Sequence, residues 1–262
     1  MGTILEVSGL SMDFGGLRAI EQFDLNITEG EIAALIGPNG AGKTTFFNCI
    51  TGIYSPAAGD IFITPPGEKR KRINGLKPNI ITRSGMARTF QNIRLFPNMT
   101  VLENIMVGRH CRTHSGILGA VLRGLSTVRE EKETIGESYA ILKKFGLSGS
   151  ANELARNLPY GEQRRLEIAR AIATKPFLLL LDEPAAGLNV RETLELDKLI
   201  ARLRDEERIS ILLIEHDMRL VMSISDRITV MDYGKKIAEG TPDEIKNDPV
   251  VIKAYLGEEF VA

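Results

Sequence analysis

The chain has 262 residues, of which 43% are hydrophobic and 26% charged, a composition typical of globular proteins with one large or two small domains. Its formal net charge of -1 does not favour a general nucleic-acid binder or a membrane-surface binder. No apolar run approaches the roughly 18 residues of a membrane span, and the first residues lack the basic and apolar regions of a signal peptide. We therefore expect a cytosolic protein. If it works at a membrane, other subunits supply the membrane-spanning segments.

The two cysteines, Cys49 and Cys111, make neither a disulfide framework nor a metal cluster, and Cys49 is expected to be a buried free thiol.

Short apolar runs separated by turn residues predict β-strands over much of the chain. In chain order the expected strands are Ile4–Val7, Phe23–Ile27, Ile32–Ile36, Ala87–Gln91, Phe177–Leu181, Ile209–Ile214, Ile228–Met231 and Lys236–Ala238. The segment Ala58–Ile63 is expected to be a turn that leads into a further strand. The continuously apolar runs among them are typical of parallel strands buried on both faces. Residues 64–79 are rich in Pro, Gly, Lys and Arg and have no apolar period, so we expect an exposed loop there.

The middle of the chain has a helical character instead. Three capping boxes of the form [ST]xx[DE] predict helix starts, at Thr100 with Glu103, Thr127 with Glu130, and Ser150 with Glu153. One helix is expected to carry Ile135, Tyr139, Leu142 and Phe145 on one face and to end at Gly146. The simplest interpretation is a helical subdomain of about residues 94–165 inserted into an α/β core of residues 1–93 and 166–240. A tail of residues 241–262 follows, where Pro242 and Pro249 are placed to begin two short helices.

The segment Gly37–Thr45 satisfies the pattern GxxxxGK[ST] of phosphate-binding loops. It follows the expected strand Ile32–Ile36 and precedes a helix expected from Thr44 to Ile50. Strand, glycine-rich turn and helix in this order direct backbone N–H groups and the positive end of a helix dipole at one spot, which suits a phosphate group. Lys43 would neutralise the outer phosphates of a nucleotide, and the Thr44 hydroxyl would ligate Mg²⁺. The residues of this segment expected to bind the phosphates are Gly37, Pro38, Asn39, Gly40, Ala41, Gly42, Lys43, Thr44 and Thr45.

Two carboxylates, Asp182 and Glu183, follow the expected strand Phe177–Leu181. Ligands of open parallel sheets bind outside the carboxyl ends of the strands, where the phosphate-binding loop is also expected. Asp182 would hold Mg²⁺ through water, and Glu183 would orient or deprotonate the attacking water. His216 follows the strand Ile209–Ile214, which we expect to lie beside the Asp182 strand, so the imidazole could reach the γ-phosphate and the water.

A further glycine turn, in Leu158–Gln163, precedes a helical run whose inward stripe is formed by Leu166, Ala169 and Ala173. A glycine turn at a helix start makes a second anion site. One chain has little use for two such sites on one triphosphate unless the second site serves a neighbouring molecule.

Together these segments resemble an ABC-type ATPase, the nucleotide-binding subunit of ATP-binding-cassette transporters, over nearly the whole chain. The resemblance implies an α/β fold, a P-loop NTPase core with a mixed sheet and an inserted helical signature subdomain. By that resemblance Gly37–Thr45 is the Walker A loop, Leu178–Asp182 is the Walker B strand, and Glu183 is the catalytic carboxylate. Gln91 is similar to the Q-loop glutamine, which senses Mg²⁺ and links the site to the helical subdomain. His216 takes the place of the switch histidine.

The remaining family positions show two departures. The signature, which acts on the nucleotide of a partner chain, corresponds to Pro159, Tyr160, Gly161 and Glu162, so that a proline replaces its serine and offers neither a hydroxyl nor an N–H. Asn189 replaces the D-loop aspartate, keeping an acceptor but no charge. Phe14 matches the aromatic residue that stacks on adenine.

Within the family, the segments Met86–Phe96, Tyr160–Arg170 and Asp182–Asn189 are similar to subunits that power the import of branched-chain amino acids, and so is the tail Pro249–Gly257. That resemblance implies ATP and Mg²⁺ as cofactors and a head-to-tail dimer with a second, related ATPase or with a second copy. It also implies two permease subunits, a substrate-binding protein and a peripheral location on the cytoplasmic side of the cell membrane, with no nucleic acid involved.

Three other functions stay open at this level. One is the ATPase of another ABC system, such as a urea or amide importer or a lipopolysaccharide exporter. Another is a soluble ABC ATPase that takes part in cofactor assembly, which only its partners would distinguish. A stand-alone P-loop kinase or GTPase would leave the signature-like turn unexplained, and no guanine-reading NKxD pattern occurs in the chain.

Overall fold

The computed structural model describes residues 2–110 and 125–256, except for the side chains of residues 125–130 and 256. Cys111 therefore lies outside what is described, and so do the side chains of the expected capping pair Thr127 and Glu130, whose backbone belongs to a helix that begins at Leu125. The chain forms two compact units. The core unit joins Met1–Arg88 with Phe177–Ala262, and the helical unit is Thr89–Pro176.

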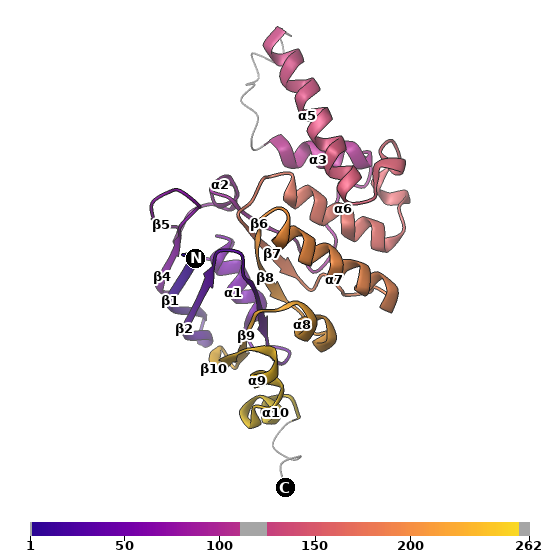
Figure 1. Cartoon of the computed structure of the whole chain (residues 1–262). Coiled ribbons are helices and arrows are strands. Elements are labelled where there is room, and N and C mark those ends of the chain that lie inside the picture. Colours follow the sequence, from indigo (N-terminus) through magenta and orange to yellow (C-terminus); the bar gives the residue numbers. More distant parts are fainter. Residues whose placement is uncertain (1, 111–124, 257–262) are drawn as a thin grey trace. The chain divides into compact units, whose positions relative to one another are not determined.

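A six-stranded sheet organises the core unit, with the strand order β10-β9-β3-β8-β7-β6 (Figure 1). Neighbouring strands run parallel except for the antiparallel pair β9 and β10, so the expected mixed sheet is confirmed. Every residue of β3, β7 and β8 is buried, as expected of parallel strands covered on both faces. The strands are β3 (Ile32–Ile36), β6 (Met86–Arg88), β7 (Leu178–Asp182), β8 (Ser210–Ile214), β9 (Arg227–Asp232) and β10 (Lys235–Gly240).

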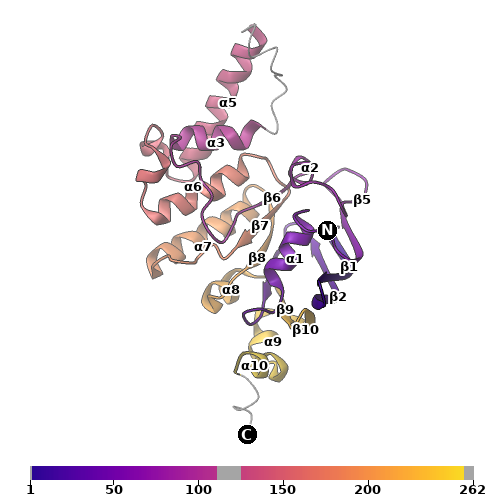
Figure 2. The ribbon, with the colours of Figure 1, turned by 180° about the vertical axis from the view of Figure 1, so that it is seen from behind.

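The core unit also has an antiparallel sheet of four strands, in the order β2-β1-β4-β5. These are β1 (Thr3–Phe14), β2 (Leu17–Thr28), β4 (Ala58–Ile63) and β5 (Lys71–Arg72), and β1 and β2 extend well beyond the short runs expected from the sequence. Helix α1 (Lys43–Ile50) lies between the two sheets (Figure 2). Its side chains Phe46, Phe47 and Ile50 share one hydrophobic core with apolar residues of both sheets.

Cys49 in α1 is the buried free thiol expected from the sequence. Burial raises its pKa to about 11, because a thiolate would lose its hydration there. This thiol is therefore protonated and unreactive at neutral pH.

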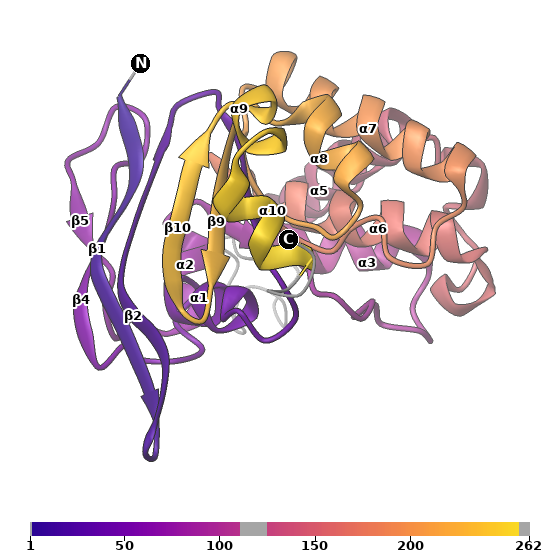
Figure 3. The same ribbon diagram turned by 90° about the horizontal axis from the view of Figure 1, so that it is seen from below.

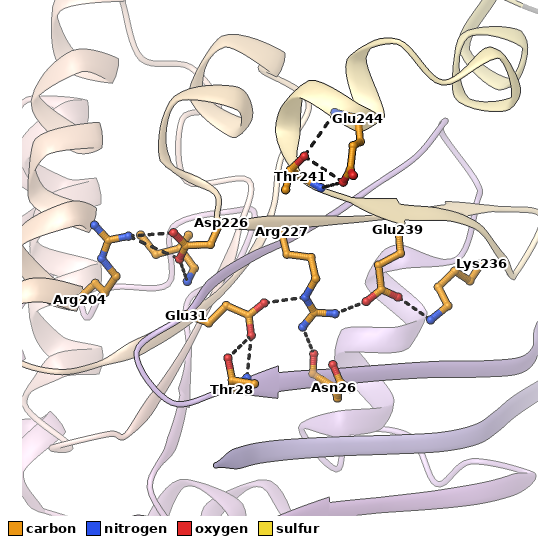
Figure 4. A network of polar contacts seen from close by, with 11 residues as sticks. Asn26, Thr28, Glu31, Arg204, Asp226, Arg227, Lys236, Glu239, Thr241 and Glu244 are labelled. Atoms are coloured by element: carbon orange, nitrogen blue, oxygen red, sulfur yellow. Dashed lines mark hydrogen bonds and ion pairs between the residues drawn. The ribbon is translucent and has the colours of Figure 1, made fainter. Parts of the chain in front are cut away.

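The two sheets approach each other where β2 runs beside β10 (Figure 3). Near the amino ends of β3 and β9 a group of polar side chains joins them (Figure 4). Arg227, the first residue of β9, donates from Nε to Glu31 Oε1 at 2.7 Å and from Nη2 to the Asn26 carbonyl of β2 at 2.6 Å, and it also pairs with Glu239 of β10. Glu31 in turn accepts from the N–H and the hydroxyl of Thr28, at 2.7 and 2.8 Å. This amino-edge network therefore connects both sheets.

The other helices of the core unit are α2 (Pro78–Arg83), α7 (Val190–Asp205), α8 (Met218–Ile224), α9 (Pro242–Lys246) and α10 (Pro249–Leu256). The expected helix starts at Pro242 and Pro249 are confirmed, and Thr241 and Glu244 form a capping box at the first of them.

Two expectations for the core unit are wrong in part. The expected loop 64–79 contains β5, which pairs with β4, and the start of α2 at Pro78. The strand expected to reach Gln91 ends at Arg88, where its pairing with β7 stops.

Three α-helices make up most of the helical unit: α3 (Val101–Arg109), α5 (Leu125–Lys144) and α6 (Tyr160–Ile172). The capping box at Thr100 and Glu103 is confirmed at the start of α3. The one expected at Ser150 and Glu153 is wrong, because Ser150 ends a short 3-10 helix and no α-helix follows it directly. The inward stripe of α6 is confirmed, since Leu166, Ala169 and Ala173 are fully buried.

The buried face of α5 differs from the expected one. Leu142 and Phe145 are buried, but Ile135 and Tyr139 are 39% and 47% exposed, and Thr134 and Ser138 are buried instead. Steps of four residues back from Leu142 lead to Ser138 and Thr134, so the helix keeps its period while polar residues occupy the buried positions. Among the described residues, no helix is both long and apolar enough to cross a membrane.

Candidate functional site

The turn from β3 to α1 makes close backbone contacts with β9, with β2 and with the turn between β9 and β10. A Cβ atom on Gly37 would lie 1.9 Å from the carbonyl oxygen of Met231, and one on Gly42 would lie 2.8 Å from the Ala19 carbonyl oxygen. The Gly234 N–H, in the turn between β9 and β10, donates to the Ala41 carbonyl at 2.8 Å. Larger residues at Gly37 or Gly42 would push the loop off this support.

The first turn of α1 has no side-chain cap, and its N-cap residue is Gly42 with φ of 110°. Backbone N–H groups at such an uncapped start, together with the positive end of the helix dipole, favour a bound phosphate. Asn39, Gly40 and Thr44 are exposed beside them. The loop therefore presents backbone donors that suit an anion, and its binding of ATP stays a prediction.

Lys43 lies folded back on this loop. Its Nζ donates to the carbonyl oxygens of Gly37 and Pro38, at 2.7 and 2.9 Å, and the side chain is buried. Burial lowers the Lys43 pKa, and the nearby charges of Glu183 and Asp182 raise it, with the net shift downward. The ammonium group is thus close enough to interact electrostatically with both carboxylates at the end of β7.

Asp182 is the last residue of β7 and is 2% exposed. Its Oδ2 accepts from Nη2 of Arg88 at 2.7 Å. Glu183 directly after it has φ of 48°, a conformation that costs free energy for a residue with a side chain, and its N–H donates to the Ile214 carbonyl of β8 at 2.8 Å. This strained turn directs the Glu183 side chain toward the end of the neighbouring strand.

The strands β7 and β8 lie side by side, with Asp182 opposite Ile214, so the neighbouring strands expected from the sequence are confirmed. His216 follows β8, and its Nε2 lies 2.9 Å from Glu183 Oε1. The Glu183 side chain is 14% exposed and the His216 side chain 41% exposed. An imidazole at hydrogen-bond distance can hold this carboxylate in one orientation at the solvent boundary.

Glu215 and Arg88 also contribute to the site, although sequence reasoning gave neither of them a role. Glu215 is 3% exposed, and its carboxylate accepts from the N–H groups of Ala185 at 2.7 Å, His216 at 2.7 Å and Asp217 at 3.2 Å. One buried carboxylate thus fixes the two loops that carry Glu183 and His216. Its position directly after a buried strand is the signal that could have found it.

Phe14 ends β1 and is 43% exposed, with its ring in edge contact with Tyr54 at 5.3 Å between centroids. An exposed aromatic face of this kind is available for stacking on a base.

Helix α10 lies close to the phosphate-binding loop, since a cavity of about 630 Å³ is lined by Pro38–Ala41, Tyr233 and Lys253. Burial raises the pKa of Tyr255 in α10 to about 12, although a hydrogen bond from the Gly37 N–H opposes the shift.

Asn189 begins α7 and serves there as its N-cap. Its side-chain oxygen accepts from the Glu192 N–H at 3.0 Å, and the Glu192 carboxylate accepts from the Asn189 N–H at 2.9 Å. The acceptor that Asn189 shares with the family's aspartate is therefore used in capping.

Gln91 and the signature residues belong to the helical unit. Pro159 is the N-cap of α6 and makes no side-chain capping bond, so the N–H groups of the first turn, including that of Gly161, have no side-chain cap. Arg164 of α6 is fully buried and donates to the carbonyl oxygens of Phe90 and Gln91, at 2.8 and 2.9 Å, and to Glu167. The signature helix thus holds the backbone of Gln91.

Magnesium would fit the donors of the core unit. The donor set is one carboxylate at a strand end, Asp182, and one exposed hydroxyl in the first turn of α1, Thr44. Oxygen ligands of this kind, completed by phosphate oxygens and water, are what Mg²⁺ prefers. In the described part of the chain no three His, Cys, Asp or Glu side chains are grouped to hold a metal.

Comparisons with known proteins agree with this geometry. The family model described as "ABC transporter" matches residues 20–186, and the one described as "Branched-chain amino acid ATP-binding cassette transporter" matches residues 235–261. The chain is 51% identical over 255 residues to the high-affinity branched-chain amino acid transport ATP-binding protein LivG of Escherichia coli, covering 97% of this chain and 98% of the relative. It is 50% identical, with the same coverage, to the corresponding protein BraF of Pseudomonas aeruginosa.

The fold has solved counterparts. The crystal structure of the ADP conformation of an ATP-binding cassette of an ABC transporter superposes with a TM-score of 0.84 at 29% identity, covering 98% of this chain and 100% of the other. A nucleotide-free ATP-binding cassette from an ABC transporter gives a TM-score of 0.83 at 30% identity, again over 98% of this chain. The α/β fold with a phosphate-binding loop is thereby confirmed.

Proposed function

Because this chain belongs to the ABC transporter family, whose members bind and hydrolyse ATP, we propose that it is the ATPase subunit of an importer of branched-chain amino acids. The proposed cargo rests on the 51% identity to LivG over 97% of the chain. The match of residues 235–261 to the branched-chain amino acid family model supports it further. Leucine, isoleucine and valine are the cargo to test first.

Hydrolysis in this proposal is carried out by the cluster at the carboxyl edge of the six-stranded sheet. Glu183 orients and deprotonates the attacking water, and His216, 2.9 Å away, holds the carboxylate toward the γ-phosphate. Lys43 pairs with the outer phosphates, whose oxygens take the place of the carbonyl oxygens of Gly37 and Pro38 as its acceptors. The loop N–H groups hold the phosphates, and Phe14 stacks on adenine.

Asp182, through water, and Thr44 would hold Mg²⁺ here, and Gln91 would sense it. The ion supplies neutralising charge to the β- and γ-phosphates. The protein contributes the fixed positions of these oxygen donors.

The helical unit acts on a neighbouring ATPase in a head-to-tail dimer, which is formed with a related chain or with a second copy. Its turn Pro159–Glu162 offers the backbone N–H groups of an uncapped helix start to the nucleotide of the partner. Since Pro159 has no hydroxyl, the Gly161 N–H and the helix dipole supply most of this contact. Two permease subunits and a substrate-binding protein complete the importer, and the chain binds peripherally at the cytoplasmic side of the membrane.

The test is affinity purification of tagged Glu183→Gln protein with ATP from detergent-solubilised native membranes. The proposal is supported if two multi-span permeases and a second ATPase are recovered, and if cells from which this chain is deleted lose uptake of leucine, isoleucine and valine. Recovery of soluble proteins alone would reject the transport function. If permeases are recovered but the deletion strain takes up all three amino acids normally, the proposed cargo is rejected and the transport function is retained.

A further inference from the structure

Arg88, the last residue of β6, connects two elements of the candidate site. Its side chain is 7% exposed, and Nη2 donates to Asp182 Oδ2 on the neighbouring strand β7 at 2.7 Å. Its Nη1 donates to Asn48 Oδ1 at 2.7 Å and to Thr51 Oγ1 at 3.2 Å, both in or directly after α1. The guanidinium carbon lies 5.3 Å from the centre of the Phe47 ring, also in α1. One planar group thus spans from the end of β7 to α1.

These two elements carry the oxygen donors to which we assign Mg²⁺. Asp182 is on β7, and Thr44 is on α1 four residues before Asn48, a spacing that places the two side chains on the same face of the helix. The distance from the Thr44 hydroxyl to the Asp182 carboxylate therefore depends on how α1 is held against the end of β7. Arg88 bonds directly to both elements.

A buried ion pair by itself is weak evidence for stability, since the loss of hydration offsets much of the attraction. What a guanidinium adds is geometry, because its N–H groups point in fixed directions and can bond two acceptors at once. An ammonium group on a flexible stem carries the same charge without that fixed fork.

We propose that Arg88 is a positioning residue that fixes Asp182 relative to Thr44 for the Mg²⁺ that accompanies ATP. This inference rests on the proposed function, because it presumes the Mg²⁺ site. It acts through the orientation of Asp182 and α1, and Arg88 touches neither metal nor nucleotide.

Charge and geometry lead to opposite expectations for the loss of Arg88. If the guanidinium acted only as a positive charge beside Asp182, its removal would strengthen Mg²⁺ binding, because the carboxylate would lose a competing cation. If it positions the donors, its removal weakens Mg²⁺ binding, and substitutions of residues that orient metal ligands lower metal affinity by about 10- to 100-fold.

The experiment measures the affinity of the full-length protein for a non-hydrolysable ATP analogue by calorimetry, once with Mg²⁺ and once with EDTA. The ratio of the two dissociation constants is the Mg²⁺ enhancement. We expect Arg88→Met and Arg88→Lys to lower this enhancement about tenfold, while the constant in EDTA stays within about twofold of that of the unaltered protein. Asn48→Ala removes one anchor on α1 and retains the charge, so it should lower the enhancement by a smaller factor.

Arg227→Met is the matched control, because it removes another part-buried arginine that pairs with a carboxylate in the core unit, and its enhancement should be unchanged. Thermal unfolding of each variant identifies any that does not fold. If the Arg88→Met protein does not fold, the Mg²⁺ enhancements of Arg88→Lys and Asn48→Ala still test the positioning role of Arg88. An unchanged or increased enhancement in the folded Arg88 variants, or full recovery in Arg88→Lys, would overturn the inference. Absence of any Mg²⁺ enhancement in the unaltered protein would instead reject the proposed Mg·ATP site, and the inference with it.

Discussion

Two arginines lie at opposite edges of the six-stranded sheet, and each pairs with a carboxylate at 2.7 Å. At the carboxyl edge, Arg88 holds Asp182, and Glu183 and His216 follow within hydrogen-bond distance of each other. At the amino edge, Arg227 holds Glu31 and also bonds the Asn26 carbonyl and Glu239. The ion pairs themselves are alike, so an ion pair alone does not mark a functional site.

The surroundings of the two pairs make the difference. The partners of Arg227 tie β9 to β10 and to β2, and Glu31 is further satisfied by the N–H and hydroxyl of Thr28. The carboxyl edge instead contains a strained Glu183, a helix start without a side-chain cap, and a lysine that bonds only carbonyl oxygens among its described partners. The N–H groups at this helix start and the Lys43 ammonium are groups that phosphates can bind, whereas the described bonds of the amino-edge network join protein groups to one another.

The largest effect is expected at the carboxyl edge, from Glu183→Gln. The amide keeps the shape of the side chain and can still bond His216, but it cannot accept a proton from water. We expect ATP hydrolysis, measured as phosphate release, to fall by about 10²- to 10⁴-fold, while ATP affinity stays near that of the unaltered protein. Hydrolysis within tenfold of normal would show that Glu183 is not the base.

His216→Ala should have a smaller effect on the same reaction. The variant removes the group 2.9 Å from Glu183 Oε1 and leaves the carboxylate able to deprotonate water in a less fixed orientation. We expect phosphate release to fall by about 10- to 100-fold without a change in thermal stability, since the imidazole is 41% exposed. A large loss of stability together with normal turnover per folded molecule would assign His216 a structural role.

At the amino edge, Arg227→Met should lower stability and leave ATP hydrolysis nearly unchanged, the opposite of the result expected for His216→Ala. The substitution leaves Glu31 buried with only its bonds from Thr28, and we expect the free energy of unfolding to fall by about 2–3 kcal/mol. Hydrolysis per folded molecule should stay within about twofold, because none of the bonds described for the amino-edge network reaches a residue of the site. Urea denaturation and phosphate release on the same preparation measure both. A tenfold loss of hydrolysis with unchanged stability would erase the distinction between the two edges.

Local patterns were sufficient for much of this site. The loop Gly37–Thr45 is recognisable because glycine spacing and a following lysine are contiguous in sequence. The side-by-side position of the strands before Glu183 and His216 follows from one rule, that parallel neighbouring strands end at the same edge, applied to two buried runs. The 2.9 Å contact between Glu183 and His216 was not predicted. The burial of β3, β7 and β8 follows in the same way from unbroken apolar composition.

Contacts that depend on distant partners were not predictable. Arg88 bonds Asp182 across 94 positions, and nothing local separates this arginine from the exposed arginines of the preceding loop. The prediction of the buried face of α5 is wrong for a different reason. Thr134 and Ser138 occupy the buried positions, although the sequence predicts apolar residues there. In both cases tertiary packing, and not local pattern, decides which side chain is buried.

The smallest effect expected is the pH dependence that Glu31 confers on stability. Burial alone would raise the Glu31 pKa, but hydrogen bonds from Arg227 and Thr28 and the charge of Arg227 outweigh it, so the pKa lies below its ordinary value of 4.5. A carboxyl group with a lowered pKa in the folded protein stabilises it above the pKa of the unfolded chain, and this contribution disappears as the pH falls through the folded pKa. The difference in unfolding free energy between the unaltered protein and Glu31→Gln should therefore be constant above about pH 6 and shrink below about pH 4.5. Urea denaturation of both proteins across this range measures it, and Arg227→Met should show a weaker acid dependence because it lacks the main group that lowers the Glu31 pKa. A difference that grows as the pH falls would mean that the Glu31 carboxyl is protonated in the folded protein, and the amino edge would then lack the ion pair on which the comparison with Arg88 and Asp182 rests.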